Sequence, residues 1–244
     1  MNDYTEFLSK KAFVYGGDGI TIDRDAIHPF LKPFQVDLTL WALRKGRAAI
    51  FADTGLGKTY MEAEWAKHIS QHTGLPVLIL APLGVARQTV RLARNIGLEV
   101  TYVRDQSEVQ PGVNITNYEM LDHFDPATFA GVVLDESSIL KNLAGKTRQK
   151  LTEMFANTPY RLCGTATPAP NDDAEIGQHA EFLGIMSATS SASAFKPHQM
   201  IHCSSLALTS SATAGTRTAT VALRTFARSP IPLRPEKKSW SSGA

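Results

Sequence analysis

Cysteine is scarce in this sequence of 244 residues. Its two cysteines, Cys163 and Cys203, are far apart and lack metal-ligand spacing, which excludes a disulfide framework and a cysteine-based zinc site. No apolar run approaches the ~20 residues of a membrane span, and the first residues, with Asp3 and Glu6, do not resemble a signal peptide. We therefore expect a cytoplasmic protein with no membrane association.

Acidic residues are almost missing from the C-terminal part of the chain. Residues 187–244 contain 7 basic and 1 acidic side chains, whereas residues 1–186 contain 18 basic and 22 acidic ones. The net charge of +2 therefore gives no argument that the main part binds nucleic acid. About a third of the tail is Ser or Thr, so we expect residues 187–244 to be disordered. Either this is a native flexible tail, or translation left its reading frame near Ser187.

A glycine-containing segment at residues 52–59 reads Ala-Asp-Thr-Gly-Leu-Gly-Lys-Thr and follows a short apolar run. Gly55 and Gly57 would let backbone N–H groups face a bound phosphate, and Lys58 would reach the β- and γ-phosphates. The Thr59 hydroxyl would ligate Mg²⁺. An amphipathic helical pattern over residues 60–69 would point its N-terminus at the anion. A plain turn between a strand and a helix is the alternative, because the general consensus has Gly at the first position.

Apolar runs alternate with helical patterns along the rest of the chain, which predicts an α/β fold with a doubly wound, mostly parallel sheet. The expected strands are residues 49–52, 77–81, 99–103, 113–116, 131–135 and 160–164, and the expected helices are residues 36–43, 60–69, 83–96, 145–155 and 172–183. A short helix at residues 4–10 precedes them, and so does a hairpin with strands at residues 12–15 and 20–22 and a turn at residues 16–19. We divide the chain into an N-terminal extension (1–29), a nucleotide-binding domain (30–186) and the tail (187–244).

Two adjacent carboxylates, Asp135 and Glu136, end an apolar strand. Metal-assisted phosphoryl transfer needs this arrangement, with Asp135 holding Mg²⁺ and Glu136 polarising the attacking water. Gln35 precedes Lys58 by about two dozen residues, and its amide can pair with the donor and the acceptor of an adenine edge, which favours ATP over GTP. Residues 164–168, Gly-Thr-Ala-Thr-Pro, form either a γ-phosphate-sensing turn or an ordinary one.

Together these segments resemble the superfamily 2 helicase motifs, in the family's order. They are Gln35, residues 52–59, Ala-Pro-Leu at 81–83, Ile-Thr-Asn-Tyr-Glu at 115–119, Asp-Glu-Ser-Ser at 135–138 with Leu-Lys-Asn at 140–142, and residues 164–168. The chain resembles the first RecA-like lobe of such an enzyme over residues 30–185. The Swi/Snf-like and phage DNA helicase branches are nearer than the RNA-directed Asp-Glu-Ala-Asp branch. In this family Ala52 is an ordinary first loop residue.

The resemblance implies roles for individual residues. ATP would be bound by Gln35, Thr54, Gly55, Leu56, Gly57, Lys58 and Thr59, with Mg²⁺ held by Thr59 and Asp135 and catalysis by Lys58, Asp135 and Glu136. DNA, double-stranded or at a strand junction, would be contacted through segments that contain Pro82, Arg87, Thr116 and Tyr118. Thr165 and Thr167 would couple ATP to DNA. Ser137 and Ser138 depart from the usual Ala/Gly-His/Asp, and Arg87, Arg91 and Arg94 otherwise form a solvated helix face.

The second RecA-like lobe of such enzymes has no counterpart in the sequence. An arginine finger from that lobe is worth roughly 10³ to 10⁵ in turnover, so we expect this chain to bind ATP·Mg²⁺ and hydrolyse it poorly. Alternatives are a nonenzymatic ATP- or DNA-binding module, a split helicase whose second lobe is a separate chain, or a small-molecule kinase. The resemblance also implies a bacterial or phage-infected cell as the setting.

Overall fold

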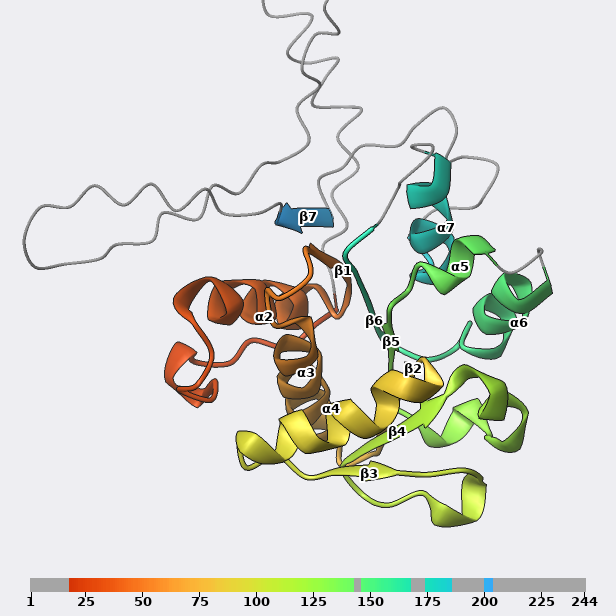
Figure 1. Cartoon of the computed structure of the whole chain (residues 1–244), viewed down its shortest axis with the longest axis horizontal. Coiled ribbons are helices and arrows are strands. Elements are labelled where there is room, and N and C mark those ends of the chain that lie inside the picture. The colour runs from red at the N-terminus through yellow and green to blue at the C-terminus, as the bar shows by residue number, and fades with distance from the viewer. Residues whose placement is uncertain (1–17, 143–145, 168–173, 186–199, 204–244) are drawn as a thin grey trace, which may run out of the picture.

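The chain forms one parallel sheet with helices on both faces (Figure 1). The computed structural model describes residues 18–142, 146–167, 174–185 and 200–203. The strand order is β3-β4-β2-β5-β6-β1-β7, and every adjacent pair is parallel. The predicted α/β, doubly wound sheet is confirmed. The strands are β1 (Arg47–Ala52), β2 (Val77–Ala81), β3 (Val100–Tyr102), β4 (Val113–Asn117), β5 (Gly131–Asp135), β6 (Tyr160–Thr165) and β7 (Met200–Cys203).

The described residues form six α-helices, of which the first precedes the first strand and the others lie between strands. They are α2 (Pro33–Lys45), α3 (Lys58–Thr73), α4 (Leu83–Asn95), α5 (Ile139–Asn142), α6 (Lys146–Met154) and α7 (Ala174–Phe182). Proline occupies the first position of α2, where its missing N–H costs nothing, and Gly46 ends the helix with φ 68°. Short 3₁₀ turns lie at Arg24–Ala26, Gln106–Glu108, Tyr118–His123 and Pro126–Thr128. No helix among the described residues is long and apolar enough to cross a membrane.

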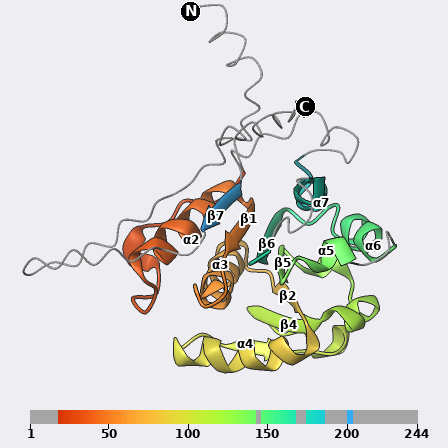
Figure 2. The same ribbon diagram turned by 45° about the horizontal axis from the view of Figure 1, so that its top comes forward.

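The sheet separates two hydrophobic cores, because successive side chains of a strand point to opposite faces. In β1, Ala48 and Ile50 pack on the face covered by α2, α3 and α4. Ala49 and Phe51 pack on the other face, with residues of α5, α6 and α7. Figure 2 shows the two helix groups on opposite sides of the sheet. The buried strands therefore read as continuous apolar runs, which made them visible in the sequence.

Some sequence expectations need correction. Residues 20–22, expected as a hairpin strand, are not in a strand; instead the Ile20 N–H donates to the Leu43 carbonyl at 2.8 Å, and Ile20 is buried. The tail was expected to be disordered throughout, but Met200–Cys203 forms β7 and pairs with β1. The expected helix at 4–10, residues 12–17 of the hairpin and the remainder of the tail lie outside the described residues.

A buried carboxylate on α3 fixes the segment that leads into α2. The Glu64 side chain is fully buried, and its Oε1 accepts hydrogen bonds from the His28 backbone N–H at 3.0 Å and from Lys67 Nζ. His68 Nε2 lies 3.1 Å from the same oxygen. Burial by itself would raise the pKa of Glu64, but the hydrogen bonds from His68, Lys67 and His28 outweigh it and lower the pKa to about 2.

This depressed pKa predicts that Glu64 makes stability dependent on acid. The ordinary pKa of this carboxyl group is 4.5, so on acidification Glu64 is protonated in the unfolded chain before it is protonated in the folded one. The ionised Glu64 therefore stabilises the fold by of order 3 kcal/mol, and this stabilisation is complete only above about pH 4.5. It is lost as pH falls from there through about 2. Urea unfolding at pH 3 to 7 should show a wild-type minus Glu64→Gln difference that shrinks with acid. Glu99→Gln, at an exposed position, serves as the control; an equal difference at all pH values would contradict the prediction.

Candidate active site

The segment predicted as a phosphate loop joins β1 to α3. β1 ends at Ala52, and α3 begins at Lys58. Gly55 and Gly57 have φ of 79° and 76°, in the left-handed region. A Cβ added at Gly57 would lie 2.4 Å from Gln35 Nε2, so backbone conformation and space both require glycine there. The free N–H groups at the start of α3 lie at this bend, as an anion site requires.

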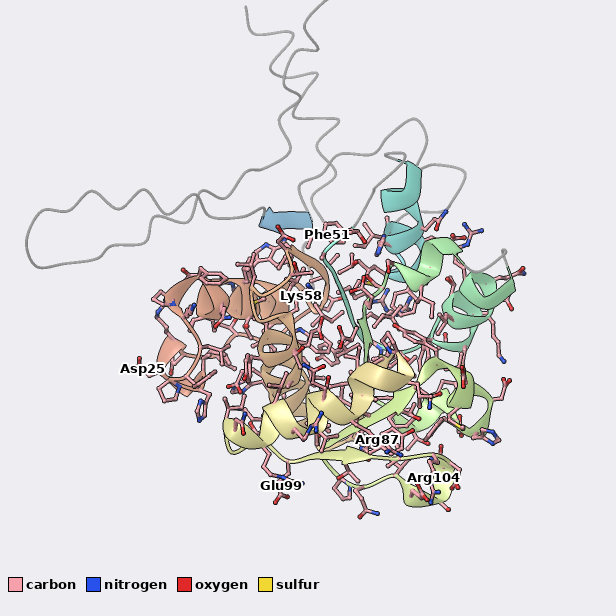
Figure 3. All side chains as sticks on the ribbon, viewed as in Figure 1. Asp25, Phe51, Lys58, Arg87, Glu99 and Arg104 are labelled. Carbon is pink, nitrogen blue, oxygen red and sulfur yellow. The ribbon has the colours of Figure 1, made fainter. Side chains whose placement is uncertain are left out.

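Lys58 lies where the loop enters α3 (Figure 3). Its Nζ donates to the Ala52 carbonyl at 2.8 Å. An ammonium group has three N–H donors, so this bond leaves two for phosphate oxygens. Thr59 follows in the first turn of α3 and is half-buried, and Thr54 and Gly55 are exposed in the loop.

Gln35 is attached to the phosphate loop. Its Nε2 donates to the Leu56 carbonyl at 2.8 Å, and its Oε1 accepts from the Lys32 N–H, also at 2.8 Å. A primary amide has a second N–H and a second lone pair, which remain for a nucleotide base. The contact with adenine stays a prediction, and the structure adds that the same amide holds the loop against the start of α2.

Asp135 ends β5 and is buried, and no N–H or hydroxyl group of the described residues donates to its Oδ2. Burial, and then the charge of Glu136, raise the pKa of Asp135 to about 6, although the charge of Lys58 lowers it. A buried carboxylate oxygen without such a donor, next to a phosphate loop, is the type of ligand that Mg²⁺ prefers. The residues present therefore fit an Mg²⁺ ion held by Asp135 and Thr59.

Glu136 is the one non-glycine among the described residues with positive φ, at 54°. Its Oε1 accepts hydrogen bonds from Ser138 Oγ and from Thr165 Oγ1, both at 2.9 Å. Unusual backbone conformations of this kind concentrate at functional sites. Thr165 is fully buried at the end of β6, so the strand next to β5 orients the predicted water-polarising carboxylate. Ser138, which departs from the family pattern, supplies the second hydroxyl.

Sequence reasoning missed Glu62, a third carboxylate at this site. Glu62 is in α3 and is buried, and no N–H or hydroxyl group in the described part of the chain donates to either of its carboxylate oxygens. Burial, and then the charge of Asp135, raise the pKa of Glu62 well above its usual value, while Lys58 lowers it. The signal was an acid at an apolar-face position of an amphipathic helix. The raised pKa favours the protonated form of Glu62, which places less negative charge beside Asp135 than an ionised carboxylate would.

A second buried contact that was not predicted connects the end of β5 to α7. Ser137 Oγ lies 3.1 Å from His179 Nε2, and both residues are fully buried. The His179 ring also makes an edge contact with Phe51 of β1, with centroids 5.3 Å apart. This contact ties the segment after Asp135 and Glu136 to the helix that covers it.

Some of the predicted DNA-facing residues are exposed, and others are buried or half-buried. Pro82 caps α4, and Arg87 is exposed on that helix (Figure 3). Thr116 is fully buried in β4, so its side chain is not exposed, and the DNA-facing role of its segment stays a prediction. The half-buried Tyr118 donates its hydroxyl proton to the Asp135 carbonyl at 2.8 Å, which makes it a support of the carboxylate strand. Thr167 is exposed, and its N–H donates to Thr165 Oγ1.

Comparisons with known proteins agree with this geometry. The model of the SNF2-related domain family matches residues 35–220. A curated relative from Xenopus tropicalis, "SWI/SNF-related matrix-associated actin-dependent regulator of chromatin subfamily A-like protein 1", is 27% identical over 165 residues, which cover 60% of this chain and 16% of that protein.

Two solved structures share the fold. The Sulfolobus solfataricus SWI2/SNF2 ATPase core in complex with dsDNA has a TM-score of 0.58 at 21% identity, over 68% of this chain and 38% of that one. The UvsW helicase of bacteriophage T4 has a TM-score of 0.53 at 16% identity, over 76% of this chain and 65% of that one. The chain thus spans less than two thirds of the length of each of these relatives.

Because Glu62 packs against β6, we predict that Gly164 cannot be replaced by a larger residue without a loss of stability. A Cβ at Gly164 would lie 1.8 Å from Glu62 Oε1, so Gly164→Ala should destabilise the fold by about 1–3 kcal/mol through overpacking. Glu62→Ala removes the obstructing carboxyl group, and adding Gly164→Ala to it should cost much less. Urea unfolding of the two single variants and the double variant measures this coupling.

Gly84→Ala is the matched control, because nothing lies within 4 Å of the added methyl group and φ is not positive there. It should leave stability unchanged or slightly increased. If Gly164→Ala costs the same in the Glu62→Ala chain as in the wild type, Glu62 does not occupy this space.

Proposed function

This chain belongs to the SNF2-related domain family, and we propose that it is the ATP-binding lobe of a DNA-dependent ATPase of the helicase or translocase type. One observation carries the proposal. The neighbouring strands β1, β6 and β5 end at one edge of the sheet, and they bring the phosphate loop, Thr165 and the two carboxylates into a single site. ATP is the proposed nucleotide, bound with Mg²⁺.

The proposed chemistry assigns each group one task. The N–H groups at the start of α3 and the Lys58 ammonium bind the phosphates, while Thr59 and Asp135 hold the metal. Bound Mg²⁺ would neutralise charge that develops on the transferred phosphoryl group. Glu136 orients the attacking water, and its two hydroxyl partners keep its Oε1 fixed. Such preorganisation lowers the cost of reaching the transition state.

The proposed DNA contact lies at the start of α4. Leu83, Gly84 and Arg87 are exposed there, and Pro82 precedes the helix. The first N–H groups of a helix have no partner within the helix and attract phosphate. The similar Sulfolobus core was solved with dsDNA, which supports duplex DNA as the proposed partner.

The chain matches only part of the length of the similar ATPase core, which bears on what it can do alone. It spans 38% of the Sulfolobus core, so we propose that a second RecA-like lobe completes the cleft and that hydrolysis by this chain alone is slow. A second candidate function is a nonenzymatic ATP-binding module, which would hold the nucleotide at the same loop without hydrolysing it. The cytoplasm of a bacterial or phage-infected cell remains the proposed location.

ATP hydrolysis with and without duplex DNA separates the two functions. The ATPase reading predicts slow hydrolysis that DNA stimulates, and Lys58→Ala should reduce it by at least about tenfold, because an ammonium contact to the transferred phosphoryl group is lost. A chain that binds ATP and releases no phosphate, with or without DNA, is the nonenzymatic module. Strand separation by the chain alone at ordinary helicase rates would contradict the proposed need for a second lobe.

The DNA surface has its own test. Arg87→Ala should weaken duplex binding and reduce its dependence on salt, because one phosphate contact is lost. Hydrolysis without DNA should not change. Arg104→Ala is the charge-matched control, since Arg104 already pairs with Glu108 at 2.8 Å. Equal effects of the two variants on DNA binding would move the DNA surface away from α4.

A further inference from the structure

His179 is a buried polar side chain that the proposed hydrolysis does not use. It lies in α7 and is fully buried, and its Nε2 is 3.1 Å from Ser137 Oγ. The ring also makes its edge contact with Phe51, with the two planes inclined at 79°. Phe51 lies in β1, which leads into the phosphate loop, and Ser137 lies two residues after Asp135. The ring is thus in contact with the strand before the loop and with the segment after the two carboxylates.

Backbone hydrogen bonds hold Ser137 on both sides. Its N–H donates to the Gly164 carbonyl of β6 at 2.8 Å, and its carbonyl accepts from the Leu140 N–H at 3.0 Å. A serine hydroxyl can donate to an imidazole nitrogen or accept from it, so the bond to His179 forms whichever ring nitrogen carries the proton. Removal of either side chain would leave its partner buried without this bond, which is costly in a protein interior.

Glu136 is fixed at its carboxylate and, through Ser137, at its backbone. Its φ of 54° is a conformation that a residue other than glycine keeps only where the surrounding structure holds it. The hydroxyl groups of Ser138 and Thr165 hold its Oε1. Because the backbone dihedral angles of Glu136 set the position of Ser137, holding the Ser137 side chain against His179 restricts the backbone of Glu136.

Resting on the proposed function, we propose that His179 is a positioning residue for ATP hydrolysis, which acts on Glu136 through Ser137. The bond between His179 and Ser137 keeps Glu136 in the backbone conformation from which its carboxylate orients the attacking water. The phosphate loop binds the phosphates of ATP, so the loss of this bond should slow the chemical step without weakening ATP binding. The ordinary alternative is that the buried pair only stabilises the fold.

Single-turnover hydrolysis of ATP·Mg²⁺ with the full chain in excess tests this, because it measures the chemical step even where hydrolysis is slow. His179→Leu should lower the rate about tenfold or more, because a small misplacement of a catalytic group is costly. It should leave the Kd of ATP·Mg²⁺ unchanged. His179→Gln, whose amide keeps a hydrogen-bonding group at the end of the side chain, should retain most of the rate. Ser137→Ala should slow hydrolysis as His179→Leu does, and the double variant should be no slower than either, because both substitutions remove the same interaction.

Val100→Ala is the control for lost stability, because Val100 is buried in β3, which β4 and β2 separate from β5. Urea unfolding gives the stability of every variant, and rates are compared at a temperature at which all of them are folded. Hydrogen–deuterium exchange without nucleotide gives a readout that needs no hydrolysis. Exchange over residues 136–140 should be faster in His179→Leu than in the wild type and unchanged in Val100→Ala.

The outcomes separate this inference from the proposed function. If His179→Leu and Ser137→Ala lose stability but hydrolyse ATP at the wild-type rate, the pair is structural, the inference is refuted and the proposed function stands. An equal loss of rate in Val100→Ala also refutes it, because the rate then follows stability. If His179→Leu does not fold, Ser137→Ala, which removes a single oxygen atom, decides in the same way. If the wild type binds ATP·Mg²⁺ and releases no phosphate, the proposed hydrolysis fails and the inference fails with it.

Discussion

The order of three strands is the constraint on which the rest of this site depends. β6 lies between β1 and β5, and all three run in the same direction. Phe51 therefore pairs with Thr165, and Asp135 pairs with Gly164. Residues far apart in sequence reach one edge of the sheet, where α3 presents its N-terminus. The phosphate loop and the carboxylates would not meet if another strand separated β1 from β6.

The buried carboxyl groups at this edge of the sheet influence one another's pKa values, and Lys58 offsets part of their negative charge. Burial raises the pKa of Asp135, and Lys58 opposes that effect. Glu62 of α3 has a pKa raised well above its usual value, first by burial and then by the charge of Asp135. Two full negative charges in a buried space would be costly. The arrangement is consistent with a site that gains stability when a divalent cation binds Asp135.

Much of this architecture could be predicted from the sequence, because its signals are local. The glycine before Lys58 at the end of a strand marked the loop. Continuous apolar runs marked the strands and helical periodicity marked the helices, in each case with bounds within a few residues of those observed. What escaped prediction depends on contacts between distant segments. β7 comes from a segment rich in Ser and Thr, the His179 contact with Ser137 spans 42 residues, and Glu62 becomes significant only because Gly164 leaves it space. The burial of Thr116 was also not foreseen, because a motif position does not reveal how exposed a side chain of a strand is.

Backbone hydrogen–deuterium exchange with and without ATP·Mg²⁺ tests most directly whether this edge is one nucleotide site. The account predicts slower exchange for the amides of residues 54–60 and of the segment around Glu136 and Thr165, with little change in α6. Slower exchange confined to the loop would show phosphate binding without the metal and water groups. Unchanged exchange at all these residues, at ATP concentrations that saturate related ATPases, would contradict the account.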